Sequence, residues 1–151
     1  SMSIDYLKQE GKKDKKVLLV VTDGNDTASS GITLEKLVEK VHRSEVLVYG
    51  IGILGKEDAR DRKRAMRAID AMTRASGGAS YYPGEVTEVE QIAQQVAHDI
   101  RNQYVIAYSP LNQNLDGTFR SIRVVAANGR YTVRTRSGYY ATPEPQKRAS
   151  R

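Results

Sequence analysis

Three apolar runs, each followed by a stretch of helical spacing, organise the first two-thirds of the chain. The runs cover residues 17–21, 46–53 and 79–82. The first run is apolar at every position, which is typical of a buried central strand in a parallel sheet. Apolar residues three or four positions apart follow each run, at Leu34, Leu37, Val38 and Val41, at Ala65, Ala68, Ile69 and Met72, and at Val89, Ile92, Val96 and Ile100. This alternation of strands and helices predicts a parallel sheet with right-handed crossovers.

Local signals predict where the helices begin and end. Thr33 precedes the first helical stretch and is suited to cap it. Gly77-Gly78 predicts the end of the second. Thr87 and Glu90 have the spacing of a capping box at the start of the third, in which each side chain bonds the other residue's backbone.

After residue 102 the pattern changes, and residues 119–126 and 130–136 alternate with a period of two. Residues 104–109, 119–126 and 130–136 predict three strands, and Asn128-Gly129 predicts a hairpin turn between the last two. The predicted fold is α/β: a truncated, doubly wound, Rossmann-like parallel sheet over residues 17–103 with a C-terminal antiparallel β appendage over residues 104–141. Residues 1–16, where Ser1 before Met2 resembles the remnant of a removed tag, and a flexible tail over residues 142–151 flank these parts.

Composition excludes several classes of chemistry. The 151 residues are the length of about one domain. The chain has no Cys and only 2 His, which excludes disulfides, thiol catalysis and Cys- or His-rich zinc sites. The longest purely apolar run, residues 17–21, is far too short to span a bilayer.

A net charge of +6 raises the question of nucleic-acid binding. Basic residues crowd the second predicted helix, but acidic residues are interleaved with them. Arg130, Arg134 and Arg136 share one face of a predicted strand. Mixed charges are more typical of a solvated face than of a phosphate-binding stripe, so we expect no specific nucleic-acid partner.

Neither histidine predicts catalysis. His98-Asp99 lies beside an apolar stripe with no nucleophile elbow in the chain, and His42 near a helix end is suited to complement the helix dipole. Gly50, Gly52 and Gly55 do not have the spacing of a dinucleotide-binding loop. We therefore predict no catalytic and no cofactor-binding residue.

Asp23 is the residue that we single out as a candidate metal ligand. It follows the first apolar run, and ligands of open α/β sheets bind beyond the carboxyl ends of the strands. A carboxylate there is a suitable ligand for a hard cation such as Mg²⁺. The Asp-Gly dipeptide at residues 23 and 24 is, however, more often found as part of a turn.

Several segments resemble, in order, the second half of a von Willebrand factor type A (VWA) domain. Residues 18–24 (LLVVTDG) resemble its fourth strand and residues 48–52 (VYGIG) its fifth. Residues 75–82 (ASGGASYY) resemble a helix end and its sixth strand, and residues 89–100 resemble its last helix. Residues 103–110 (QYVIAYSP), 119–124 (FRSIRV) and 134–140 (RTRSGYY) resemble the closing segment of the VWFA-related, acidobacterial-type subgroup. The resemblance covers residues 17–141. It implies a binding or adhesion module without catalysis, whose parent is exported and whose partner is another protein.

The resemblance also implies a metal-ion-dependent adhesion site, of which this chain carries a part. That site holds Mg²⁺ or another divalent cation with an Asp-x-Ser-x-Ser motif after the first strand, a Thr on a middle loop and an Asp after the fourth strand. Only the last of these matches, at Asp23, while Gly24, Asn25 and Asp26 shape the same loop. Residues 26–30 (DTASS) lack the middle Ser. We therefore expect the C-terminal half of such a domain, with no tightly bound metal ion in this chain.

An enzyme class gives the alternative interpretation. Residues 22–26 (TDGND) also resemble the late acidic motif of haloacid-dehalogenase-type phosphatases, which holds Mg²⁺. That chemistry requires a nucleophilic Asp in an Asp-x-Asp loop after an earlier strand, and no such loop precedes residue 17 in this sequence.

A half domain leaves the strand at residues 17–22 without a neighbour on one side. An apolar strand with an unpaired edge is prone to pair with another chain. We expect a homodimer in which two copies of this strand pair antiparallel about a two-fold axis. Coverage by residues 4–9 or by the C-terminal hairpin is the alternative.

Overall fold

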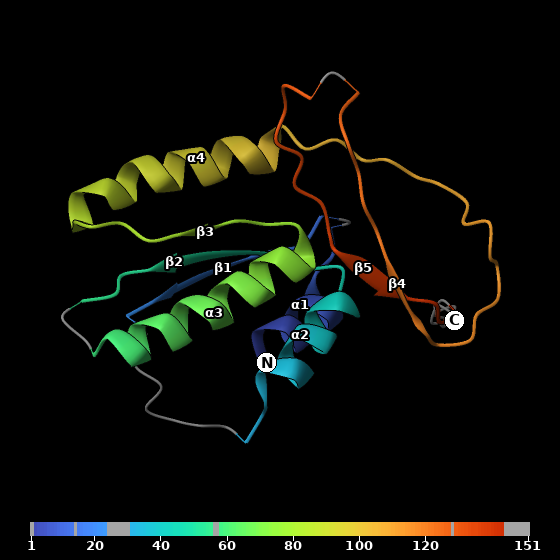
Figure 1. Ribbon diagram of the computed structural model, residues 1–151, viewed down its shortest axis with the longest axis horizontal. Helices are drawn as coiled ribbons and strands as arrows, with labels where there is room; N and C mark the ends of the chain where they lie inside the picture. The colour runs from blue at the N-terminus through green and yellow to red at the C-terminus, as the bar shows by residue number, and fades with distance from the viewer. Residues whose placement is uncertain (1, 14, 24–30, 56–57, 128, 144–151) are drawn as a thin grey trace.

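A three-stranded parallel sheet forms the centre of the structure, a computed structural model that describes residues 2–13, 15–23, 31–55, 58–127 and 129–143 (Figure 1). Its strands are β1 (Val17–Thr22), β2 (Leu47–Gly52) and β3 (Ser80–Tyr81), in the spatial order β1-β2-β3. Both pairs are parallel. The predicted α/β class with a parallel sheet is therefore confirmed.

Helices lie on both sides of this sheet. They are α1 (Met2–Glu10), α2 (Leu34–His42), α3 (Ala59–Ser76) and α4 (Val89–Arg101), the last preceded by the short 3₁₀ helix η1 (Val86–Glu88). Figure 1 shows α1, α2 and α3 on one side of the strands and α4 on the other. The strands and helices thus alternate from β1 to α4 as the apolar spacing predicts.

Two of the three predicted helix ends are confirmed, and the third is wrong. The Thr33 hydroxyl accepts a hydrogen bond from the Lys36 amide at 3.4 Å, and Gly77 ends α3 at a left-handed φ of 88°. The capping box of Thr87 and Glu90 does not form, because α4 starts directly from η1 with no side-chain cap. The carboxylate of Glu88 instead accepts from the Gly84 amide at 3.0 Å.

Strand β2 is the buried centre of the sheet. Its Val48, Tyr49 and Ile51 side chains are almost fully buried. Gly50 lets α3 approach closely, since a Cβ atom there would lie 2.3 Å from Cγ2 of Ile69. The glycines of β2 therefore serve helix–strand packing.

Strand β1 lies at the edge of the described sheet, as expected for a half domain, although its apolar run alone is typical of a central strand buried on both faces. On one face Leu18 and Val20 pack against the core cluster that includes Ile4 of α1. On the other face Leu19 is 45% and Val21 is 55% exposed. An unbroken apolar run predicted two covered faces, whereas the described chain covers one of them.

The C-terminal part is a two-stranded antiparallel sheet, which corrects the prediction of three strands. Strand β4 (Phe119–Ser121) pairs with β5 (Gly138–Tyr140), and Phe119 lies opposite Tyr140. The pairing continues in the bond from the Ile122 amide to the Ser137 carbonyl at 2.9 Å, and Gly129 lies in the connecting turn with a φ of 63°. Residues 104–109 and 130–136 are not strands, because alternation favours a strand only where a neighbour completes the ladder. Asn128 lies outside the described residues.

Gly78 tests the close contact between the end of α3 and β2. A Cβ atom at Gly78 would lie 1.9 Å from the carbonyl oxygen of Val48, so Gly78→Ala must displace backbone. We expect a loss of about 2 kcal/mol in the free energy of unfolding, measured by urea titration. The matched control is Gly84→Ala, because a Cβ there meets no atom within 4 Å, and it should change stability by less than about 0.5 kcal/mol. Equal effects of the two variants would contradict the packing.

Candidate functional site

Asp23 lies exposed at the carboxyl end of β1, where the sequence places it. Within the described ranges, no three acidic or histidine side chains gather closely enough to hold a metal ion. The loop residues Gly24, Asn25 and Asp26 lie outside the described residues. The described side chains therefore do not fit a Mg²⁺ site on their own, because the ion requires several oxygen ligands.

A second carboxylate, Asp70 on α3, has a structural role that the sequence pattern did not reveal. Its Oδ1 atom accepts from the Ser80 hydroxyl at 2.5 Å and from the Tyr82 hydroxyl at 2.6 Å. Burial, together with the hydrogen bond to Asp70, raises the pKa of the Tyr82 phenol. These bonds join α3 to the segment that contains β3. The Asp70 carboxylate is thus engaged by two uncharged hydroxyl donors.

His42 is a buried contact with the C-terminal hairpin, which corrects its prediction as a charged complement to the helix dipole. The side chain is 8% exposed, and its ring centroid lies 4.8 Å from that of Phe119 in an edge-to-face arrangement. Burial and the nearby charge of Arg136 lower the pKa of His42, against the hydrogen bond to Gly138. The Arg136 guanidinium donates to the His42 carbonyl at 2.5 Å. His42 therefore favours the neutral form and holds the hairpin against the end of α2.

Contacts within the chain occupy two of the predicted basic stripe's arginines. Arg134 forms an ion pair with Asp99 of α4, and Arg136 bonds to the backbone of α2 and β5. The other carboxylate oxygen of Asp99 accepts from the side-chain amide Nε2 of Gln95 at 2.8 Å, so Asp99 is engaged by Gln95 and Arg134. These arginines position elements rather than present a row of charges to phosphates.

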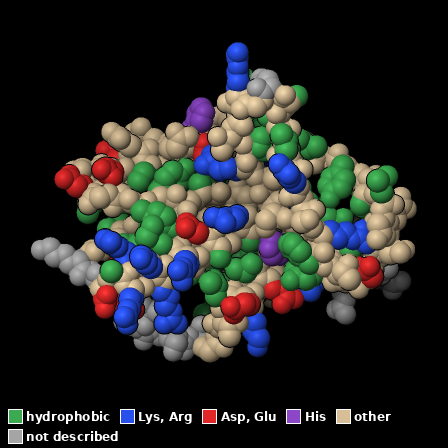
Figure 2. Space-filling view, viewed as in Figure 1, with side chains coloured by type: hydrophobic (Ala, Val, Ile, Leu, Met, Phe, Trp, Pro, Cys, Tyr) green, Lys and Arg blue, Asp and Glu red, His purple; other side chains and the backbone are tan. Residues whose placement is uncertain are grey.

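A gathering of basic side chains over α3 is visible at the lower left of Figure 2. It consists of exposed residues from the first three turns of the helix, namely Arg60, Arg62, Lys63, Arg64 and Arg67. Asp58 caps this helix through the Arg60 amide, and Asp61 lies in its first turn. The mixed charges are typical of a solvated helix face, as the sequence predicts.

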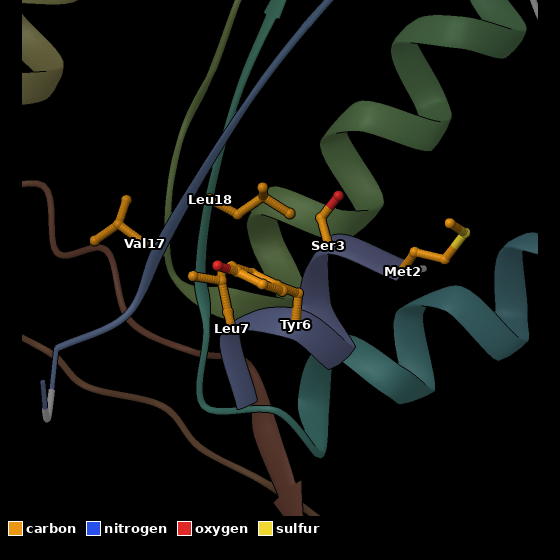
Figure 3. Close-up of a pocket in the computed structure, with 6 residues that line it drawn as sticks. All are labelled: Met2, Ser3, Tyr6, Leu7, Val17 and Leu18. Atoms are coloured by element: carbon orange, nitrogen blue, oxygen red, sulfur yellow. The ribbon is translucent and has the colours of Figure 1, made fainter. Parts of the chain in front are cut away.

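A shallow apolar hollow lies between α1 and the start of β1 (Figure 3). It has a volume of about 420 Å³ and is lined by Met2, Ser3, Tyr6, Leu7, Val17 and Leu18. Figure 3 shows the Tyr6 ring and Leu18 on the same side of β1, with Val17 on the other. The lining provides no charged side chain, so the hollow suits an apolar side chain of a partner better than a polar metabolite.

A second hollow of about 400 Å³ lies between the end of α3 and the hairpin. Its lining combines Asp70 with Arg74, Arg123 and Arg134. Asp70 and Arg134 are already bonded to neighbouring elements, and Arg74 and Arg123 are exposed. This hollow therefore lacks the convergent polar groups that fix a small ligand.

The most exposed apolar side chains lie in residues 103–111, which join α4 to the hairpin and are called the connecting segment below. Tyr104 is 95% and Val105 is 89% exposed, and Ile106 and Leu111 are also exposed. Figure 1 shows this segment extending away from the C-terminal end of α4. This exposure agrees with the absence of the strand that was predicted for residues 104–109. Tyr108 contacts the hairpin through a hydrogen bond with Tyr139, which raises the pKa of the Tyr108 phenol.

Comparison of the chain with family models, curated proteins and solved structures finds no match. Across the described ranges, no helix has both the length and the apolar character needed to cross a membrane.

His42 gives the hairpin contact a defined pH dependence. Its pKa is lowered in the folded state, so the unfolded chain binds the proton more readily. We expect the free energy of unfolding to fall as the pH drops below about 6.5, the ordinary histidine value, because acid then favours the unfolded state. Urea titrations between about pH 8 and about pH 5 measure this fall. His42→Phe keeps an aromatic ring against Phe119 and should flatten the profile; a variant profile parallel to that of the parent chain would contradict the assignment.

Proposed function

We propose that this chain is a non-catalytic, VWA-like module that binds another protein. The order of three parallel strands, each followed by a helix, supports this proposal, because the second half of a VWA domain has that order. The hairpin after α4 is compatible with the closing segment of the VWFA-related subgroup. In this proposal Asp23 belongs to a metal-assisted site that the described side chains do not complete, and the parent protein is exported.

Exposure of the connecting segment is the observation that carries the proposal. Tyr104, Val105 and Ile106 follow one another and are all exposed, although apolar side chains of this size are ordinarily covered. Contiguous exposed apolar side chains mark interaction surfaces. The segment also has the apolar sequence of a predicted strand, but no neighbouring strand pairs with it in the described chain. A partner that pairs an extended strand with the connecting segment would form hydrogen bonds with the backbone of this segment and would also cover its side chains.

Three acidic side chains of the described residues are engaged by neighbouring groups of the chain. Asp70 accepts from two hydroxyl groups, and Asp99 is paired with Arg134. Asp116 accepts from the Thr118 amide and hydroxyl, which lowers the pKa of Asp116. These three carboxylates thus take part in contacts that hold neighbouring parts of the chain together.

Site-specific photo-cross-linking tests the connecting segment. Ile106 is replaced by p-benzoylphenylalanine, and the protein is irradiated in the cells that produce it. We expect a discrete adduct with a different protein, because the exposed side chain lies within the proposed interface. Val86 in η1 is also exposed and is the matched control position. Identical adducts at the two positions, or adducts with this same chain alone, would refute the proposed partner surface.

A phosphatase assay separates this proposal from the alternative. The chain is incubated with p-nitrophenyl phosphate and millimolar Mg²⁺, and release of p-nitrophenol is recorded. We expect no release above that of an Asp23→Asn variant, because one carboxylate supplies neither nucleophile nor complete metal site. Mg²⁺-dependent turnover that Asp23→Asn abolishes would favour the haloacid-dehalogenase interpretation and exclude the binding module.

A further inference from the structure

The outer edge of β1 has a defined set of backbone groups directed away from the sheet. The carbonyl of Lys16 accepts from the Leu47 amide at 2.9 Å, and that of Thr22 accepts from the Ile53 amide at 2.8 Å. Even-numbered residues of β1 therefore direct their backbone groups toward β2. Because backbone direction alternates along a strand, Val17, Leu19 and Val21 direct theirs outward. In the described chain, β1 pairs with β2 alone.

The same odd-numbered residues place their side chains on the exposed face of β1. Within β1 this face carries Val17, Leu19 and Val21, and Lys15 and Asp23 flank the strand two positions before Val17 and two positions after Val21. The two valines are equidistant from Leu19, and so are the oppositely charged Lys15 and Asp23. Lys15 and Asp23 are both exposed. When two copies of this strand run antiparallel, apolar side chains therefore lie opposite apolar side chains and each charge lies opposite its counter-charge.

We propose that a second copy of this chain pairs antiparallel with β1, with Leu19 opposite Leu19 of the partner subunit. A two-fold axis perpendicular to the sheet generates this pairing and keeps equivalent side chains on one face. It places Val17 opposite the partner's Val21 and Lys15 opposite the partner's Asp23, twice in each dimer. The outward backbone groups of Val17, Leu19 and Val21 then form the new ladder.

The positions of the charged residues favour the register centred on Leu19 over a shifted register. A shift of the axis by one residue, to Val20, would place Val17 opposite the partner's Asp23 and would separate the charges. Cross-strand pairs of opposite charge stabilise a sheet, and an apolar side chain opposite a carboxylate does not. Lys15 already donates to the Ile100 carbonyl at 3.0 Å, but an ammonium group has three donors and can also pair with a carboxylate.

The surface on the α1 side of the sheet is also compatible with a second copy of the chain as the partner. The apolar hollow lined by Tyr6, Leu7 and Leu18 lies beside β1, and Tyr6 and Met2 are exposed there (Figure 3). Pairing through β1 would bring the two copies of α1 toward each other across the axis. The interface is separate from the connecting segment, so the dimer and the protein-binding proposal can fail independently.

Charge reversal tests both the dimer and its register. Molar mass is measured by sedimentation across a concentration series for the parent chain, Lys15→Asp, Asp23→Lys and the double variant. Each single change sets like charges opposite each other at both ends of the interface. We expect each to raise the dimer dissociation constant by about tenfold or more. The double variant restores opposite charges and should return to within about threefold of the parent value.

The control variant is Lys63→Asp, which makes the same charge change on the exposed face of α3 and should leave the dissociation constant unchanged. Far-UV circular dichroism verifies that all variants are folded. A parent chain that is monomeric throughout the series overturns the dimer. A double variant no better than the single ones overturns the register.

Discussion

The parallel pairing of β1 with β2 is the interaction on which the rest of the structure depends. It commits the even-numbered backbone groups of β1 to β2 and leaves the odd-numbered ones facing outward. The same alternation sends Leu18 and Val20 toward the core beneath α1 and leaves Leu19 and Val21 exposed. One strand thus joins the sheet on one side and, on the other, presents an apolar surface with a defined register.

The C-terminal hairpin is fixed by contacts of a different kind. Phe119 packs edge-to-face on His42, the Arg43 guanidinium lies 3.9 Å from the Tyr140 ring centroid, and Arg136 bonds to the end of α2. With the hairpin held at α2 and α4 held by the ion pair of Asp99 with Arg134, the connecting segment spans two anchored elements. The apolar side chains of the connecting segment face solvent between these two elements, where a partner protein can contact them.

The sequence predicts what depends on near neighbours and misses what depends on distant ones. The alternation of strands and helices, the Thr33 cap and the Gly77 helix end were all predictable, because each rests on residues a few positions apart. The apolar run of β1 by itself is typical of a central strand, and its edge position was expected only from the resemblance to a half domain, because the five apolar residues of a strand do not encode its neighbours. For the same reason residues 104–109 were predicted to be a strand. The burial of His42 depends on Phe119, far along the chain, and the role of Asp70 depends on hydroxyl groups around β3.

Amide hydrogen exchange along β1, followed by NMR at two protein concentrations, tests the central claim most directly. The account predicts that the amides of Leu18 and Val20 are protected at both concentrations, because they face β2. The amides of Leu19 and Val21 should be protected at the high concentration and exchange rapidly at the low one, where the second copy has dissociated. Equal protection of odd- and even-numbered amides in the dilute sample would contradict the account, because the outer edge of β1 would then be covered within a single chain.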